Sequence, residues 1–398
     1  MSYIKILDTA LWWSITLLVS SFYIFSSESN GKYLQVFLTG VIGGLCVLRY
    51  WKNLNLRVTI FHVWIFLFAV FSLLSSFWAL IPEMAIKRGI VIMQSFVYMS
   101  VVYVYANHQK SILPLLDCIR WAGYIMTFYL LLVYGWGSLR YLMQESMRID
   151  SDLINSNVIG MILGFSIVLT LYRWIFVKFS VWYLLAFPEL VVLSITASRK
   201  AFAVLVLGSV AVLGIKYLKK NILTNIMYIF VGAIILLGIG YFLLSLPMFE
   251  QMQQRLTGLL GLFSSNTILD ESTFMRQQMM LAGFRQIFET PLLGIGIGST
   301  GFISLRVVGW DTYLHNNYAE LIASGGIIGT ALYYFMHFFT GIPLFLKRFT
   351  GNNTLMCFIL LALMFLMDWG MVSYYGKGTY FFLLTFFMQV QLDKRRKT

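Results

Sequence analysis

The chain has 398 residues, of which 59% are hydrophobic and only 11% are charged, with a mean hydropathy of +0.80. This composition excludes a water-soluble domain, which needs a charged outer shell, and makes lipid the main solvent of the protein. The net charge of +13 is compatible with nucleic acid, anionic lipid or an anionic substrate as a partner. We expect a polytopic membrane protein that forms one integral membrane domain over residues 1–398.

Apolar runs of roughly 17 to 25 residues recur along the chain, which is the length of a helix that crosses a bilayer. The weaker alternating pattern of a transmembrane β-barrel is not seen in the sequence. The first run has no small-residue cleavage site behind it, so we interpret it as a retained helix. The sequence predicts about twelve spans, at residues 9–25, 33–48, 58–77, 89–105, 112–136, 156–172, 179–196, 201–215, 222–246, 314–346, 354–371 and 379–391.

Basic residues divide unevenly between the two sides of this predicted topology. With both termini in the cytoplasm, the short inner segments carry most of the Lys and Arg residues, as the positive-inside rule requires. Insertion bias does not explain the basic residues of the outer segments, which are Lys32, Lys87, Arg88, Arg140, Arg148, Arg199, Lys200, Arg255, Arg276, Arg285, Arg306 and Lys377. We therefore expect an anionic group to be handled on the outer face.

Patterns that would indicate metal or redox chemistry are weak. Asp150 and Asp152 form a D-x-D triplet, which holds a metal in many glycosyltransferases but arises often by chance in polar loops. We predict no metal and no cofactor. Glu189 lies near the middle of a span, where a partner at a kink is the first interpretation and a functional site the alternative. The three cysteines lie in apolar runs and are expected to be buried hydrophobes: Cys46, Cys118 and Cys357.

Residues 247–313 form the one sizeable polar stretch and predict a large outer loop with helices of its own. A first helix, lying in the membrane interface, is indicated by apolar residues on one face of MFEQMQQRLTGLLGLF: Met252, Leu256, Leu259, Leu260 and Phe263. A second helix is expected over residues 274–288, with Ser272 or Thr273 as its cap and Pro291 just beyond its end.

The segment after Pro291, LLGIGIGSTG, fits the pattern G-x-G-x-x-G through Gly296, Gly298 and Gly301. No strand precedes it and it lies in an outer loop, so a dinucleotide site is a weak interpretation. We predict a flexible turn, with a backbone N–H cradle for phosphate as the alternative.

The segment LHNNYAELIASGGIIGTALYY directly follows the large loop. If a helix begins near Leu314, then His315, Gly326 and Gly329 share one face, because each residue turns the helix by about 100°. Small residues on that face would admit another helix or a lipid chain. Glu320 would fall on a different face and is the poorer candidate for direct cooperation with the histidine.

The spacing of His315, Asn316, Gly326 and Gly329 resembles the H-[NSQ]-x9-G-x-x-G signature of the O-antigen polymerase and ligase superfamily. Two further segments match in the expected order. TASRKAFAVL resembles the short outer turn of that family, and RQQMMLAGFRQIFETPLLGIGIG resembles the helix and Gly-rich turn of its large periplasmic loop. The similarity covers roughly residues 190–335, while the N-terminal half matches mainly in topology.

The resemblance implies an all-α, GT-C-like glycosyltransferase in the bacterial plasma (inner) membrane, with its active site facing the periplasm or exterior. The implied partners are an undecaprenyl-diphosphate-linked glycan donor, a sugar-hydroxyl acceptor, membrane lipids, and a flippase and chain-length regulator, with no nucleic acid. Arg199 and Arg276 are predicted to stabilise the leaving diphosphate, and His315 to receive the acceptor proton. Predicted substrate-binding residues are Asn316, Arg148, Arg88, Arg285 and Tyr318.

Three activities share these features, and we favour a polymerase that joins repeat units of a surface polysaccharide. The alternatives are an O-antigen ligase that transfers the glycan to lipid A–core, or a protein O-oligosaccharyltransferase. A secondary transporter is the alternative from another class. It is less favoured because the sequence shows neither repeated halves nor broken helices around a midplane site.

Overall fold

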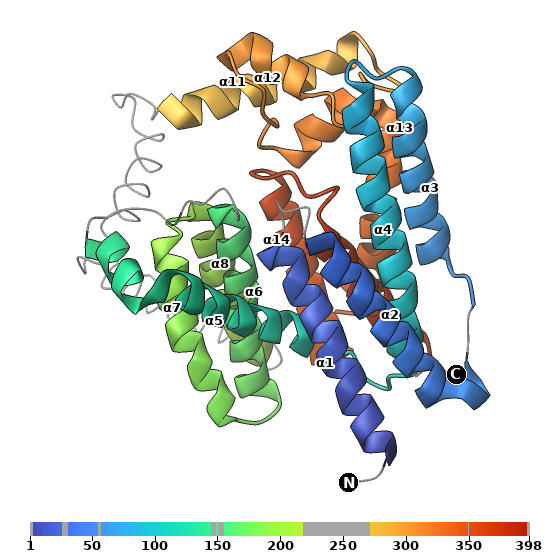
Figure 1. Cartoon of the computed structure of the whole chain (residues 1–398), viewed down its shortest axis with the longest axis vertical. Coiled ribbons are helices and arrows are strands. Elements are labelled where there is room, and N and C mark those ends of the chain that lie inside the picture. Colours follow the sequence, from blue (N-terminus) through green and yellow to red (C-terminus); the bar gives the residue numbers. More distant parts are fainter. Residues whose placement is uncertain are drawn as a thin grey trace. The chain divides into compact units, whose positions relative to one another are not determined.

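The computed structural model describes residues 3–25, 31–54, 57–144, 149, 155–217, 271–348 and 350–395. Within these ranges every regular element is a helix (Figure 1). The chain divides into two compact units that alternate along the sequence. The first comprises residues 1–45, 111–267 and 348–363, and the second comprises residues 46–110, 268–347 and 364–398.

The first unit is built from helices that pack through small residues. A Cβ atom on Gly164 would lie 3.1 Å from the carbonyl oxygen of Ala201, and α5 changes direction at Gly135, where φ is 69°. The helices of this unit are α1 (Tyr3–Ile24), most of α2 (Gly31–Tyr50), α5 (Leu113–Gln144), α6 (Ser156–Phe176), η3 (Val181–Leu185), α7 (Ala186–Ile195), α8 (Arg199–Tyr217) and the first part of α14 (Asn352–Asp368).

Charged groups inside the first unit lie close to one another. Asp117 forms ion pairs of 3.1 Å with both Arg120 and Arg173, which is how charged side chains are tolerated between apolar helices. Glu189 on α7 is fully buried, and its Oε1 atom would lie 2.4 Å from a Cβ on Gly123 of α5. Glu189 is therefore buried inside this unit, and both the predicted role as a partner at a kink and the functional alternative stay predictions.

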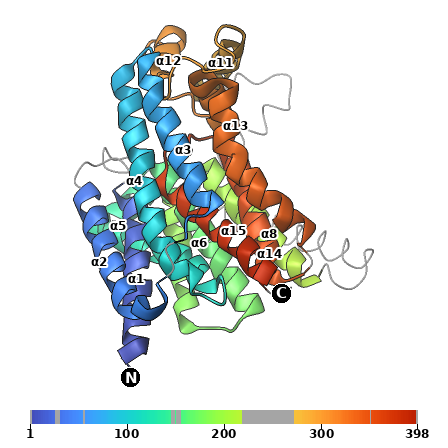
Figure 2. The ribbon, with the colours of Figure 1, turned by 90° about the vertical axis from the view of Figure 1, so that its right-hand side faces the viewer.

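The second unit is held together by aromatic side chains. Phe68 packs on Tyr333 with ring centroids 5.4 Å apart, and the indole N–H of Trp64 donates to the carbonyl oxygen of Leu332 at 2.7 Å. Its elements (Figures 1 and 2) are η1 (Trp51–Asn53), α3 (Ile60–Leu74), η2 (Ser75–Phe77), α4 (Pro82–Asn107), α11 (Glu271–Arg285), η6 (Gln286–Phe288), α12 (Gly301–Val308), α13 (Asn317–Leu346), the end of α14 and α15 (Lys377–Arg395).

Seven of the described helices are long and apolar enough to cross a membrane, namely α1 to α6 and α13. Eleven of the twelve predicted spans coincide with described helices, although several of these helices are shorter or more polar than a complete span. The span at 222–246 lies outside the described residues, as does the helix expected around Met252–Phe263. The all-helical fold is thus confirmed, and the number of spans stays a prediction.

The helix that follows the large loop differs from the prediction at two points. Asn316 is its N-cap and accepts a hydrogen bond from the backbone N–H of Ala319 at 2.9 Å, so α13 begins at Asn317 and His315 lies outside it. The helix is also broken at Gly326, whose φ of 61° and ψ of −163° are not helical. The predicted helical face shared by His315, Gly326 and Gly329 is therefore wrong. The expectation that small residues admit a neighbour is confirmed, because Gly329 packs against Phe71 of α3.

Candidate active site

The Gly-rich turn lies between the start of α4 and the break in α13. The backbone N–H of Ile295 donates to Ala323 at 2.9 Å, and the carbonyl oxygen of Ile295 accepts from Leu80 at 3.0 Å. The N–H of Ile297 donates to Ser75 Oγ at 3.1 Å. The turn is confirmed, but it is buried and fixed by hydrogen bonds. These bonded N–H groups are already satisfied within the protein, which argues against their use as a phosphate cradle.

The same turn repairs the broken helix. A break in a helix leaves backbone N–H groups without their intrahelical acceptors. Just after Gly326, the N–H groups of Ile327 and Ile328 donate to the carbonyl oxygens of Pro291 and Leu292, at 2.9 and 3.1 Å. A Cβ on Gly326 would lie 2.4 Å from the Leu292 oxygen, so glycine is required for this approach. The segment at Pro291 and Leu292 is thereby fastened to α13.

We expect Gly296→Ala to lower the stability of the second unit. Gly296 has φ of 91°, and a Cβ there would lie 2.3 Å from the Cα of Ala79. Backbone strain and overpacking together should reduce the free energy of unfolding by about 2 to 5 kcal/mol. Gly309→Ala is the matched control, because φ is 86° and no atom lies within 4 Å of the added Cβ. Thermal unfolding in detergent should show a clearly larger loss for Gly296→Ala than for Gly309→Ala, which has the backbone strain without the overpacking, and equal losses would contradict the packing described.

His315 is held in an unusual backbone conformation directly before α13. Its backbone φ is 56°, a left-handed value that residues other than glycine rarely adopt. Such backbone strain is concentrated at functional sites. Its ring packs against that of Tyr313, with centroids 4.1 Å apart. The residues on both sides are fixed, since Asn316 caps α13 and the N–H of Leu314 donates to Glu320 Oε2 at 2.9 Å.

Glu320 has a role that the expected helical faces did not reveal. It is buried, and its second carboxylate oxygen accepts a hydrogen bond of 2.5 Å from the hydroxyl of Thr300, at the end of the Gly-rich segment. Its carboxylate therefore connects the loop to the backbone immediately before His315. The prediction that it is a poor partner for the histidine ring was based on an incorrect helix start, and the structure assigns it to the backbone around that residue.

Asn316 and Asn317 connect the same region to the segment after α14. Asn316 Nδ2 donates to the carbonyl oxygen of Trp369 at 3.0 Å, in addition to the capping bond. Asn317 Nδ2 donates to Asp368 Oδ2 at 3.3 Å, and its Oδ1 accepts from the N–H of Ser373 at 2.9 Å. Asn316 is thus held by hydrogen bonds within the protein, and its predicted part in substrate binding stays a prediction. The roles of Asn317 and Asp368 were not predicted, because residues about 50 positions apart give no local signal of their pairing.

Arg88 approaches the same segment from α4. Its Cζ atom lies 3.7 Å from the centroid of the Tyr375 ring, which is a close cation–π contact. The Cγ atom of Arg88 would lie 3.1 Å from a Cβ atom added to Gly298. The pKa of Tyr375 is raised to about 12, and burial is the largest cause. The charge of Arg88 acts in the opposite direction, while Glu320 and Tyr313 add to the increase. Tyr375 is thus neutral at physiological pH, and Arg88 lies close to both the Gly-rich turn and the neighbourhood of His315.

The arginines of α11 lie on different faces of that helix. Met279 and Gly283 pack against Leu314 and Ala319, and the sulfur of Met280 lies 3.2 Å from Asn316 Nδ2. Arg276 precedes Met280 by four residues and shares this face, one turn away from the contact with Asn316. Arg285 lies nine residues from Arg276, on the opposite side, and is exposed. α11 begins at Glu271, so Ser272 and Thr273 lie within it and do not precede it.

The other predicted site residues have these positions. Tyr318 donates its hydroxyl hydrogen to the carbonyl oxygen of Phe365 at 2.8 Å and stacks on Tyr334, which gives it a packing role. Arg199 is the first residue of α8 in the first unit, after a turn in which Ala197 has φ of 46° and Ser198 Oγ donates to Asn157 Oδ1 at 3.1 Å. Arg148, Asp150 and Asp152 lie outside the described residues.

Comparison with known protein families gives one match. Residues 184–334 match the family model described as O-antigen ligase. No curated protein matches the chain. The matched segment includes Arg199 of the first unit and, in the second unit, Arg276, the Gly-rich turn, His315 and the break in α13. Through this segment the chain, a multi-pass helical membrane protein, is similar to the O-antigen ligase and polymerase superfamily, whose members are glycosyltransferase-like enzymes acting on lipid-linked glycans.

Proposed function

We propose that the chain is a polymerase that joins undecaprenyl-diphosphate-linked repeat units into a surface polysaccharide, on the outer face of the bacterial inner membrane. The observation that carries this proposal is the arrangement around the start of α13, where His315 has a strained backbone and α11, the helix that carries Arg276, contacts the neighbouring Asn316; these residues lie within the matched family segment. A transfer from a diphosphate-linked glycan needs cations for the leaving group and an acceptor for one proton. This region offers both.

The donor is bound through its diphosphate. Arginine suits this group because its planar fork can donate two parallel hydrogen bonds to phosphate oxygens. Arg276 lies on the α11 face that contacts Asn316, and the guanidinium of Arg88 is oriented by the ring of Tyr375. Arg199 is proposed, from its place in the matched family segment, to bind diphosphate as well. Arg148 and Arg285 are proposed as further substrate-binding residues.

The acceptor hydroxyl reacts next to the ring of His315. The acceptor hydroxyl oxygen attacks the anomeric carbon, the bond from that carbon to the diphosphate oxygen breaks, and undecaprenyl diphosphate leaves with the bonding electron pair. The hydroxyl proton passes to the His315 ring as the new glycosidic bond forms. Asn316 and Glu320 keep the backbone on both sides of His315 in place. Attack opposite the leaving group inverts the anomeric centre.

An O-antigen ligase is the second candidate, because the matching family model carries that description. The two activities differ only in the acceptor. Purified protein should therefore be given a synthetic undecaprenyl-diphosphate repeat unit alone, or the same donor together with lipid A–core. A product ladder from the donor alone supports the polymerase, whereas transfer that requires lipid A–core would replace it with the ligase.

We predict that the ring of Tyr375 matters for donor binding. Tyr375→Leu removes the aromatic face that orients Arg88 and should raise KM for the lipid-linked donor roughly 3- to 10-fold, with a smaller change in kcat. Tyr375→Phe keeps the face and should behave like the unchanged protein. Steady-state kinetics on both variants check this, and equal defects in the two would mean that the hydroxyl and not the ring is important.

A further inference from the structure

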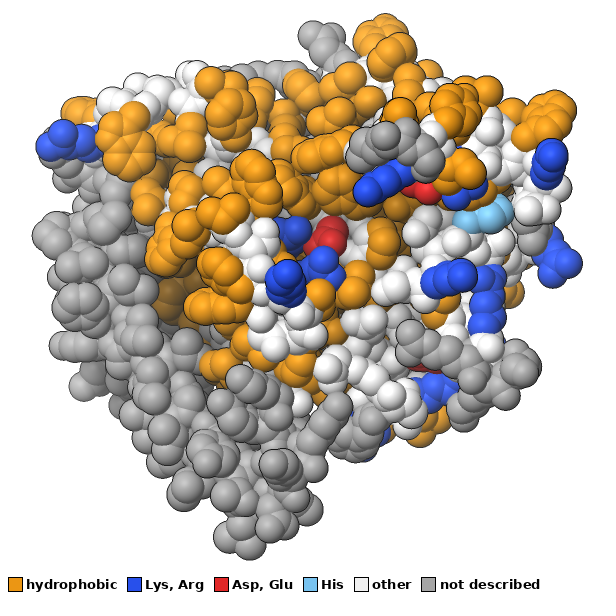
Figure 3. All heavy atoms as spheres, turned by 90° about the horizontal axis from the view of Figure 1, so that it is seen from below, with side chains coloured by type: hydrophobic (Ala, Val, Ile, Leu, Met, Phe, Trp, Pro, Cys, Tyr) orange, Lys and Arg blue, Asp and Glu red, His pale blue; other side chains and the backbone are white. Residues whose placement is uncertain are grey.

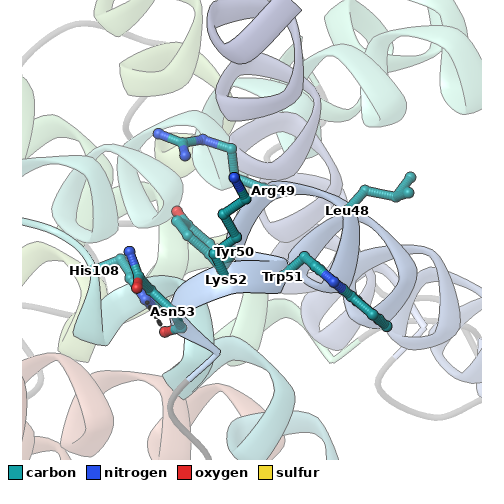
Figure 4. A pocket seen from close by; sticks show the side chains of 7 residues that line it. All are labelled: Leu48, Arg49, Tyr50, Trp51, Lys52, Asn53 and His108. Carbon is teal, nitrogen blue, oxygen red and sulfur yellow. Dashed lines mark hydrogen bonds between the residues drawn. The ribbon is translucent and has the colours of Figure 1, made fainter.

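A second candidate binding site lies at the far end of α4, where α2 ends and the chain turns through η1. A pocket of about 490 Å³ is lined there by Leu48, Arg49, Tyr50, Trp51, Lys52, Asn53 and His108, all in the second unit (Figure 4). The Gly-rich turn contacts the first two turns of α4, at Met84 and Arg88, whereas His108 caps its last turn. The helix has 26 residues and is therefore about 39 Å long, so the pocket is remote from the candidate active site.

The pocket is a fixed structure and not a chance gap between loops. The rings of Tyr50 and His108 stack with centroids 3.8 Å apart and an angle of 11° between their planes. His108 Nε2 lies 3.1 Å from the carbonyl oxygen of Asn53, and its Nδ1 lies 2.8 Å from that of Val104. These contacts fasten η1 to the end of α4, as Figure 4 shows for the side chains that line the pocket.

The charge of this region is positive. Arg49 and Lys52 line the pocket, and Arg395 of α15 donates hydrogen bonds to the adjacent Asn107. Residues 46–110 contain a single acidic residue, Glu83, which lies in the first turn of α4 at the opposite end. Among the described side chains seen from below, Lys and Arg are more frequent than Asp and Glu (Figure 3).

The exposed side chains around the pocket favour a position at the depth of lipid headgroups. Trp51 is 75% exposed and Leu48 is 61% exposed, and both side chains point away from the Tyr50–His108 stack (Figure 4). An exposed tryptophan at the end of an apolar helix is typical of a membrane–water interface. A basic pocket at this depth, beside apolar side chains that contact acyl chains, matches the phosphodiester headgroup of an anionic lipid.

We propose that this pocket binds the phosphate of an anionic phospholipid, with Arg49 and Lys52 as the cations that contact it. Structural roles alone, such as favourable interaction of basic residues with the carboxyl ends of α2 and α4, would require positive charge but no preference for a particular lipid. The proposal concerns a site separate from the glycosyl-transfer site and does not depend on the proposed function.

Lipid binding by the full chain in detergent micelles tests this proposal. Phosphatidylglycerol is titrated while binding is followed by native mass spectrometry, with phosphatidylcholine as the zwitterionic comparison and glycerol phosphate as the free headgroup. Arg49→Gln with Lys52→Gln should weaken phosphatidylglycerol binding roughly 10- to 30-fold. The matched control is Lys347→Gln with Arg348→Gln, which removes the same charge at the end of α13 and should change binding less than twofold.

Two further results complete the test. Arg49→Lys with Lys52→Arg preserves the charge and should retain binding, which separates lost charge from lost folding. Equal weakening in the pocket variant and the control, equal binding of both lipids, or loss of binding in the charge-preserving variant would overturn the proposal. Competition by glycerol phosphate at the same concentration as the lipid would overturn the assignment of a lipid as the occupant.

Discussion

His315→Ala should lower turnover by roughly 10²- to 10⁴-fold while leaving donor affinity nearly unchanged, because the proposed proton acceptor is lost but the diphosphate contacts remain. The rate of the unchanged protein should rise with pH as the His315 ring loses its proton, since only the neutral ring accepts a proton. The His315→Ala variant should lack this rise of the rate with pH. Asn316→Ala should reduce the rate less, because the capping bond to Ala319 orients His315 without reacting.

A matched surface variant controls for general damage to the outer region. Arg306 of α12 is exposed and packs over the ring of Phe302, with its Cζ 4.1 Å from the ring centroid. Arg306→Ala should therefore keep full turnover and the same pH profile. Full activity of His315→Ala would refute the base assignment and leave the arginines with a substrate-assisted route.

Arg276→Ala and Arg199→Ala should each lower kcat/KM by roughly 10²- to 10³-fold, because each removes a charge-assisted contact to the diphosphate that strengthens as the leaving group gains charge. Lys at either position should restore activity only in part, since an ammonium group cannot reproduce the bidentate fork. Kinetics on purified variants, together with donor binding measured directly, check both expectations.

The double variant Arg276→Ala with Arg199→Ala tests whether both arginines bind the same diphosphate. If Arg276 and Arg199 contact the same diphosphate, their effects should not be additive, and the double variant should lose less than the product of the single losses. Wild-type output and donor affinity in both alanine variants, in protein that inserts correctly, would show that these arginines serve topology alone.

The sequence predicted the helices better than it predicted the site. Apolar runs are long and continuous, so eleven predicted spans coincide with helices in the described residues. Helix ends were less certain, because they depend on single side chains. The start of α13 is set by the Asn316 cap and its break by Gly326, and periodicity alone continues through both positions.

Most of the site residues predicted from the sequence lie within the matched family segment, and the others were chosen because their charge is unexpected on the predicted outer side. Those that were missed act through partners distant in the chain. Tyr375 became relevant only through its contact with Arg88, and Asn317 only through Asp368 and Ser373. Neither a tyrosine nor an asparagine next to an apolar run carries a local signal that would identify such a partner.

The central claim, that this chain transfers a lipid-linked glycan by means of His315, is tested most directly by single-turnover assay of the purified protein. A synthetic undecaprenyl-diphosphate repeat unit is supplied, and the release of undecaprenyl diphosphate is followed together with the length of the glycan product. The account predicts coupled release and elongation by the unchanged protein and by Arg306→Ala, with a loss of roughly 10²-fold or more in His315→Ala. Absence of any transfer by correctly folded wild-type protein, or equal rates in His315→Ala, would contradict it.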